Sequence, residues 1–278
     1  MVTLVGVTIA YDRPGRLTGL DGVQSAAIGV LDTDPVAICV PVQGLVIQPT
    51  DPGARDLPEH RQAENQVRPA ADLVARLYEL APRPITEPRE PHQRVVGTCR
   101  HFAVLACSLL RHRGVPSRVR CGFATYFVKD RAVDHWMVEY RDHDGGRWIR
   151  LDPEILGQKV VEHPEDLAQD QFLSGAEAWI AFRRGEINAD RFGVFGTENW
   201  GPAEIRGNLV KDLASLNKVE MLPWDEWGRM TEAYEGTTGP DYDYLLDDVA
   251  AVCAADDPAA IAAIYEHPDL EVPDPLIR

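Results

Sequence analysis

Cysteine pairs and basic residues are the two things this sequence has little of. The five cysteines are scattered and form no CxxC pair: Cys39, Cys99, Cys107, Cys121 and Cys253. An odd, scattered set argues against a disulfide framework and against a zinc ribbon, so reduced thiols are expected. Only 28 Lys and Arg stand against 44 Asp and Glu, giving a formal net charge of -16. This balance argues against nucleic acid as a partner, because phosphates need a basic surface, and it favours cationic or amine partners.

Long hydrophobic runs are absent as well. No apolar run is long enough to cross a bilayer, so no membrane partner is expected. The opening residues MVTLVGVTIAYDRPGR have no basic segment before their short apolar run, unlike a signal peptide. We therefore expect a cytoplasmic protein. With 278 residues and 45% apolar composition the chain can bury a full core.

The order of patterns along the chain predicts an α+β fold in a single domain, residues 1–278. Alternating apolar stretches over 2–11 and 36–48 predict a β-rich N-terminal segment, 1–68. A catalytic core is expected over 69–160, beginning with a helix that starts at Pro69 and ends before Pro82. The remainder, 161–278, has helical periodicity over 165–185, 209–222, 244–255 and 258–267, which predicts a helical C-terminal extension.

The stretch GTCRHFAVLACSLLRHRGVPSRV carries the clearest helix signal. Thr98 is a suitable N-cap, and Gly114 followed by Pro116 supplies the stop. Cys99 therefore falls at the head of a helix, where unpaired N–H groups and the helix dipole favour a thiolate. A metal site built from Cys99, His101 and His112 matches no recognised ligand spacing, so no metal is predicted.

A base and a group to orient it come from the next elements. Residues 119–127 alternate as a strand, and HWMVEY and RWIRLD flank the six-residue turn RDHDGG as a β-hairpin. If Tyr140 pairs with Arg147, His135 lies directly opposite Asp152. A register slip of two keeps both on one face, whereas a slip of one separates them. Asp134 points to the other face, where a solvated role is expected.

Cys99 at a helix start, with His135 and Asp152 on successive strands, resembles the core of the transglutaminase-like superfamily. The motifs that carry the resemblance are GTCRHFAVLACSLLRHRGVPSRV, DHWMVEY and RWIRLDPE, within about residues 90 to 155. The resemblance implies a papain-like core, in which a Cys-bearing helix packs on an antiparallel sheet that carries His and Asp. It also implies a catalytic triad of Cys99, His135 and Asp152, with no metal and no organic cofactor.

The reaction implied is acyl transfer through a thioester acyl-enzyme, with a small-molecule or peptide amide, ester or thioester as donor. Water as acceptor gives hydrolysis and an amine gives a new amide; the sequence leaves this choice open, together with the oligomeric state. Gln93, six residues before Cys99, is a candidate oxyanion-hole donor or an ordinary polar loop residue. The alternative to an enzyme is a non-catalytic peptide- or protein-binding module that keeps a papain-like cleft.

Four charged side chains outside the triad have two interpretations each. Arg118 and Arg120 share a predicted strand face with Tyr126, and they would either line the cleft and bind a substrate carboxylate or form a solvent-facing stripe. Lys211 and Lys218 lie on a helix whose leucines form a buried stripe, so a solvated face is expected for both lysines.

Overall fold

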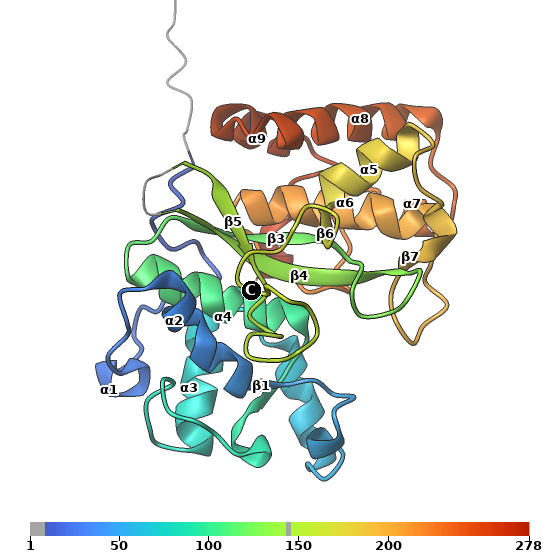
Figure 1. Ribbon diagram of the computed structural model, residues 1–278. Coiled ribbons are helices and arrows are strands. Elements are labelled where there is room, and N and C mark those ends of the chain that lie inside the picture. The colour runs from blue at the N-terminus through green and yellow to red at the C-terminus, as the bar shows by residue number, and fades with distance from the viewer. Residues whose placement is uncertain (1–8, 143–145, 278) are drawn as a thin grey trace, which may run out of the picture. The chain divides into compact units, whose positions relative to one another are not determined.

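The computed structural model describes residues 9–142 and 146–277 and combines helices with sheets (Figure 1). The α-helices are α1 (Ser25–Ile28), α2 (Pro35–Cys39), α3 (Ala70–Leu80), α4 (Cys99–His112), α5 (Gly175–Arg183), α6 (Pro202–Leu216), α7 (Met230–Tyr234), α8 (Pro240–Ala255), α9 (Pro258–Tyr265) and α10 (Asp274–Ile277). Short 3₁₀ turns are η1 (Val40–Gly44), η2 (Pro52–Ala54), η3 (Glu59–Gln66), η4 (Pro91–Gln93) and η5 (Ala189–Arg191). The α+β class predicted from the sequence is confirmed.

The strands form two sheets. They are β1 (Val46–Ile47), β2 (Val95–Val96), β3 (Ser117–Ala124), β4 (Ala132–Arg141), β5 (Trp148–Leu151), β6 (Phe172–Ser174) and β7 (Phe192–Gly193). The larger sheet has the order β5-β4-β3-β6, and β7 pairs with β4. The β3–β6 and β4–β5 pairs are antiparallel, whereas β7 runs parallel to β4. The smaller sheet is a parallel pair of β1 and β2.

The chain divides into two compact units. The described residues of the Cys99 unit are 11–119, 136–142 and 146–167, and those of the α6 unit are 9–10, 120–135 and 168–277. The unit boundaries differ from the predicted segment boundaries at 68 and 160, because each unit is assembled from separate stretches of chain. The single domain over 1–278 stays a prediction.

Within the Cys99 unit, α4 is the central helix. Every residue from Cys99 to Arg111 is buried, and α2 and α3 both pack against this helix. Gly114 follows it with φ 74°, a left-handed conformation that ends the helix as its sequence predicts. The helix predicted to start at Pro69 and end before Pro82 is also present, as α3. The element that carries Cys99 is thus held on several sides by its own unit.

Within the α6 unit, α6 contacts α5, α7, α8 and α9, and also β6 and β7. Asn208 on this helix donates from Nδ2 to the Gly122 carbonyl oxygen at 3.1 Å. Lys211 is buried, and its Nζ lies 3.2 Å from the Tyr234 hydroxyl. The expected solvated face is therefore wrong for Lys211, because this helix is covered on more than one side. Burial alone would lower the pKa of Lys211, but Tyr234 and Asp134 raise it overall.

The N-terminal segment corrects the sequence analysis. Over the described residues 9–68 only Val46–Ile47 is a strand, so the predicted β-rich segment is wrong there. Asp34 caps α2 by accepting from the Ala37 N–H at 2.8 Å, and Pro35 occupies the first helical position. Residues 36–44 are therefore helical although their apolar residues suggest a strand. Residues 2–8 of the other predicted strand lie outside the described part of the chain.

The helix predicted over 165–185 is correct only in its second half. Residues 172–174 form β6, and α5 begins after the cap Ser174. Ser174 accepts from the Glu177 N–H at 3.3 Å, and the Glu177 carboxylate accepts from the Ser174 N–H at 2.8 Å. This reciprocal capping box marks the boundary between strand and helix.

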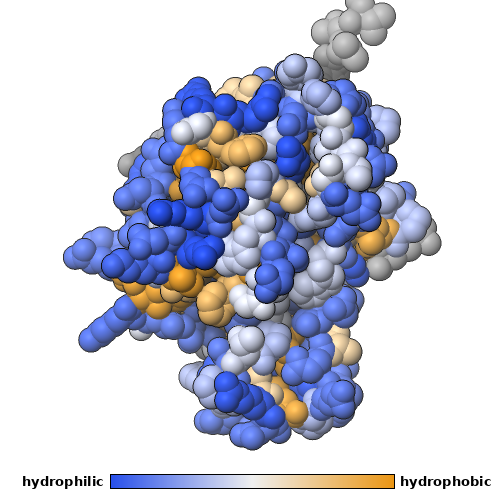
Figure 2. Space-filling model, turned by 90° about the vertical axis from the view of Figure 1, so that its right-hand side faces the viewer, coloured by the Kyte–Doolittle hydropathy of each residue, from blue (hydrophilic) through white to orange (hydrophobic). Residues whose placement is uncertain are grey.

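No helix among the described residues is long and apolar enough to cross a membrane. The face drawn in Figure 2 is mostly hydrophilic, with its hydrophobic residues in separate patches.

Candidate active site

Cys99 is the first residue of α4, as the sequence predicts. Thr98 before it is extended, with φ -109° and ψ -179°, and its N–H donates to Nδ1 of His101 at 3.0 Å. The Cys99 side chain is buried, with 8% of its surface exposed. The N–H groups of a first helical turn are not used by the helix itself and favour an anion. The position therefore suits a thiolate.

A short ladder fixes the chain just before the cysteine. Val46 pairs with Val95 and Ile47 with Val96, and the Gly97 N–H donates to the Ile47 carbonyl oxygen at 3.0 Å. A Cβ on Gly97 would lie 2.7 Å from Cγ of His101 and 3.0 Å from a Val46 methyl, so only glycine fits here. The close packing of β1, β2 and the residues that cap α4 therefore fixes the position at which α4 begins, and with it Cys99.

A buried carboxylate reinforces the same ladder. Glu64 accepts from the Val96 N–H at 3.0 Å and from Nη2 of Arg61 at 2.9 Å. Arg61 donates in turn to the Arg94 carbonyl oxygen at 2.6 Å, and Arg76 donates to Glu64 at 2.8 Å. Burial would raise the pKa of Glu64, but the hydrogen bonds from Arg61, Val96 and Arg76 lower it overall. The ionised carboxylate of Glu64 therefore holds β2, the strand that precedes Cys99, in place.

Gln93 lies in η4, and its Oε1 accepts from the Glu90 N–H at 3.3 Å. In this arrangement the side chain caps its own turn. The role of Gln93 in an oxyanion hole stays a prediction.

His135 lies on β4 in the α6 unit and is 2% exposed. The Phe127 ring is 5.0 Å from the imidazole between centroids, and the Tyr126 ring is 6.2 Å away, both edge-on. These two aromatic side chains come shortly after the end of β3 and contact the imidazole edge-on. Asp134, its neighbour, accepts from Nδ2 of Asn208 at 2.8 Å. Asp134 therefore binds a residue of α6, and the solvated role expected for it is wrong. Burial raises the pKa of its carboxyl group.

The hairpin that carries the acid is confirmed, but its register differs from the one assumed. Tyr140 pairs with Ile149 and not with Arg147, and Arg141 pairs with Trp148. The strand β4 runs one residue further than predicted, to Arg141, whereas β5 begins one residue later, at Trp148. Beyond this pair the Asp142 N–H donates to the Arg147 carbonyl oxygen at 3.1 Å. The shift is two residues, so the predicted face is kept.

Asp152 follows β5 directly and is fully buried. Its N–H donates to the Pro164 carbonyl oxygen at 2.9 Å, and its Oδ1 accepts from the Glu154 N–H at 3.0 Å. The carboxylate thus holds the loop that follows the strand. Its role as the group that orients His135 stays a prediction.

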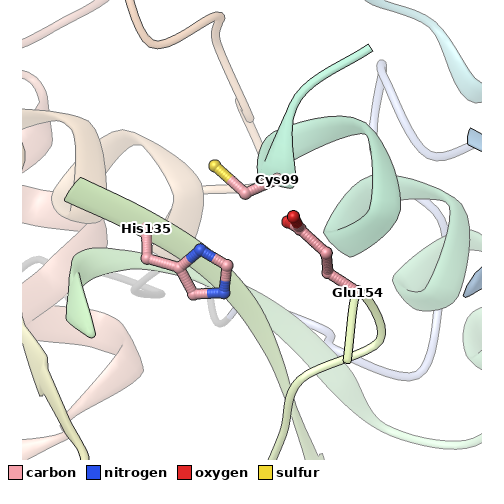
Figure 3. A group of neighbouring side chains, drawn as sticks. All are labelled: Cys99, His135 and Glu154. Carbon is pink, nitrogen blue, oxygen red and sulfur yellow. The ribbon is translucent and has the colours of Figure 1, made fainter. Parts of the chain in front are cut away.

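Glu154 is the residue that the sequence analysis missed. Within the Cys99 unit, a carboxylate oxygen of Glu154 lies within 4.8 Å of the Cys99 sulfur (Figure 3). Oε1 of Glu154 also accepts from Nε2 of Gln48 at 2.9 Å, and Gln48 directly follows β1.

The arginines predicted to line a cleft have structural partners. Nε of Arg118 donates to Glu139 at 2.7 Å, and its guanidinium lies 4.0 Å from the Trp148 ring centroid. Arg120 donates to both carboxylate oxygens of Asp212 at 2.8 Å. Both arginines are buried. Both arginines therefore differ from the two interpretations of the sequence: they are not exposed to solvent, and each already binds a carboxylate of the protein.

Comparison with known proteins gives a family match over part of the chain. Residues 59–153 match the sequence model of the transglutaminase-like superfamily. No curated protein matches the chain. Two solved structures are similar: a candidate cysteine protease from Cytophaga hutchinsonii, with 17% identity and a TM-score of 0.36, and red sea bream transglutaminase, with 16% identity and a TM-score of 0.31.

These two likenesses are partial. The first covers 59% of this chain and 44% of the Cytophaga chain, and the second covers 43% of this chain and 22% of the sea bream chain. The family match spans all three predicted triad positions, with η3 at its start and Pro153 at its end. The resemblance to the transglutaminase-like superfamily is therefore confirmed for residues 59–153, the stretch that carries Cys99, His135 and Asp152.

Proposed function

We propose that this protein is a cysteine-dependent acyl-transfer enzyme. The observation that carries the proposal is the position of Cys99, the first residue of α4 inside the segment that matches the transglutaminase-like superfamily. A helix start favours the thiolate, which is the nucleophilic form of cysteine. His135 and Asp152 lie in the same matched segment and supply the base and the acid that such a nucleophile needs.

In the first half-reaction the Cys99 sulfur attacks the carbonyl carbon of an amide, ester or thioester. His135 accepts the thiol proton and passes it to the leaving group as the bond between carbonyl carbon and leaving group breaks. The product is a thioester between the acyl group and Cys99. Asp152 would hold the imidazole in the tautomer that accepts this proton and would stabilise the imidazolium.

In the second half-reaction water or an amine attacks the thioester carbonyl. The C–S bond breaks, a proton of the nucleophile returns to the sulfur through His135, and the product is an acid or a new amide. The backbone N–H of Cys99 is the first candidate to stabilise the oxyanion in both halves, because helix-start N–H groups point toward that position. Gln93 remains a candidate for the second donor, provided that its side chain leaves Glu90.

Intact-mass spectrometry tests the proposal. The protein is incubated with activated esters and thioesters of short acyl groups, and the acyl adduct is sought on the wild-type chain. The adduct should disappear in Cys99→Ala and persist in Cys107→Ala, which removes a buried thiol from the same helix.

An adduct that persists in Cys99→Ala would contradict the proposed nucleophile. No adduct with any donor, together with alkylation of Cys99 no faster than that of a free thiol, would favour the non-catalytic binding module.

A further inference from the structure

Glu154 places a negative charge beside the proposed nucleophile, inside the Cys99 unit. Its carboxylate lies within 4.8 Å of the Cys99 sulfur, and Gln48 donates to that carboxylate at 2.9 Å. The Glu154 backbone is held as well, because its N–H donates to Asp152 at 3.0 Å. Both ends of the residue are thus fixed, and the side chain is only half-buried.

A carboxylate in this place opposes the first step of the reaction. Two like charges a few ångströms apart repel each other, so an ionised Glu154 makes the Cys99 thiolate less favourable. The helix start works in the other direction. The carboxylate therefore does not assist formation of the nucleophile.

The situation reverses once the acyl-enzyme has formed. The sulfur of a thioester carries no charge, so the repulsion is gone while the carboxylate remains fixed beside the reacting carbonyl. A fixed carboxylate at the edge of a buried site binds an ammonium group well, because the charged hydrogen bond is partly shielded from water. The net charge of -16 also attracts cations to the protein as a whole.

We propose that Glu154, positioned by Gln48, binds the ammonium group of a primary alkylamine and so selects an amine over water as the acyl acceptor. This inference rests on the proposed function and assigns the second substrate of the same site. The amine nitrogen forms the C–N bond as the C–S bond breaks. Of the two protons that the ammonium nitrogen loses, one restores the Cys99 thiol through His135, and the other passes to Glu154 and then to water.

A partition experiment tests this role separately from acylation. The acyl-enzyme is formed from p-nitrophenyl acetate and mixed at neutral pH with propylamine, which is cationic, or methoxyamine, which is neutral. The ratio of the two aminolysis rate constants measures selection for charge. Glu154→Gln keeps the size and hydrogen-bonding capacity of the side chain but removes its charge. Glu162→Gln removes an exposed carboxylate from the same loop region and is the matched control.

In Glu154→Gln the propylamine-to-methoxyamine ratio should fall by about tenfold, the loss of one partly shielded ion pair. Acyl-enzyme formation should be faster, because the charge that opposes the thiolate is removed. Glu162→Gln should match the wild type in both measurements. Gln48→Leu keeps the charge but releases the carboxylate, and should lower the ratio by a smaller factor, about threefold.

An unchanged ratio in both Glu154→Gln and Gln48→Leu would overturn the inference and leave the proposed function intact. Loss of acyl-enzyme formation in Glu154→Gln, with the fold retained by circular dichroism, would also overturn it, because the residue would then act in the first half-reaction. Failure of the wild type to form any acyl-enzyme would instead contradict the proposed function itself. If Glu154→Gln does not fold, the ratio measured in Gln48→Leu decides.

Discussion

Replacing Asp212 with alanine should destabilise the protein far more than removing a surface carboxylate. Asp212 is fully buried, accepts two hydrogen bonds of 2.8 Å from Arg120, and accepts a third of 3.1 Å from the Cys121 N–H. The Asp212→Ala variant leaves the buried guanidinium without its carboxylate. Breaking such a pair from one side costs about 3–5 kcal/mol of unfolding free energy, a large part of the 5–15 kcal/mol typical of a folded protein.

Urea unfolding followed by tryptophan fluorescence measures this loss. The matched control is Asp166→Ala, which removes the partner of Arg147 in a pair whose side chains are 58% and 41% exposed. That variant should lose less than about 1 kcal/mol. A double variant, Arg120→Met with Asp212→Leu, should recover most of the loss, because no charge is then left buried. If Asp212→Ala loses no more stability than Asp166→Ala, the burial argument for this pair is refuted.

Three further variants test other parts of the account. Gly97→Ala should cost about 1–3 kcal/mol of stability and slow acyl-enzyme formation, because the new Cβ would overlap His101; normal stability would contradict the close approach. Burial raises the pKa of Glu204 to about 7, despite the opposing charge of Lys211. The protonated form of a carboxyl group with a raised pKa stabilises the folded protein fully at pH values below the pKa of the unfolded state, and this stabilisation is lost as the pH rises through about 7. Glu204→Gln should therefore stabilise the protein on the order of 2 kcal/mol more at pH 8 than at pH 5. Equal effects at both pH values in unfolding assays would refute this. Asp152→Asn keeps an acceptor oxygen for the Glu154 N–H but no charge to orient His135, and should slow acyl-enzyme formation by about 10²–10⁴-fold with the fold retained; a normal rate would remove Asp152 from the proposed triad.

The helix that carries Cys99 could be predicted because its signals are local. A cap at Thr98, apolar residues at helical spacing and a stop at Gly114 all lie within a short stretch of sequence. The hairpin strands were predictable for the same reason. Their register was not, because it depends on where the turn closes, and the strands extend to the Arg141–Trp148 pair.

Two predictions were wrong because the apolar pattern was given more weight than the local capping residues. Asp34 followed by Pro35 is a helix start, yet the apolar residues after it suggested a strand. Ser174 and Glu177 form a capping box inside a stretch that was interpreted as one continuous helix. In both places the capping residues predicted the boundary better than the periodicity did.

The charged interior could not be predicted from local sequence. Arg120 donates to Asp212 on α6, and Lys211 contacts the Tyr234 hydroxyl on α7, so both side chains have partners that are distant in the sequence. Glu154 was missed for a related reason, because only its approach to Cys99 and the hydrogen bond from Gln48 draw attention to it.

Alkylation of Cys99 by iodoacetamide near neutral pH, followed by peptide mass spectrometry, tests the central claim most directly. Cys253, with 6% of its surface exposed against 8% for Cys99, is the internal reference. The account predicts that Cys99 reacts at least about tenfold faster than a free cysteine, because the thiolate is the reactive form, and that His135→Ala slows it to the free-thiol rate. A Cys99 that reacts no faster than a free thiol, or whose rate is unaffected by His135→Ala, would contradict the account.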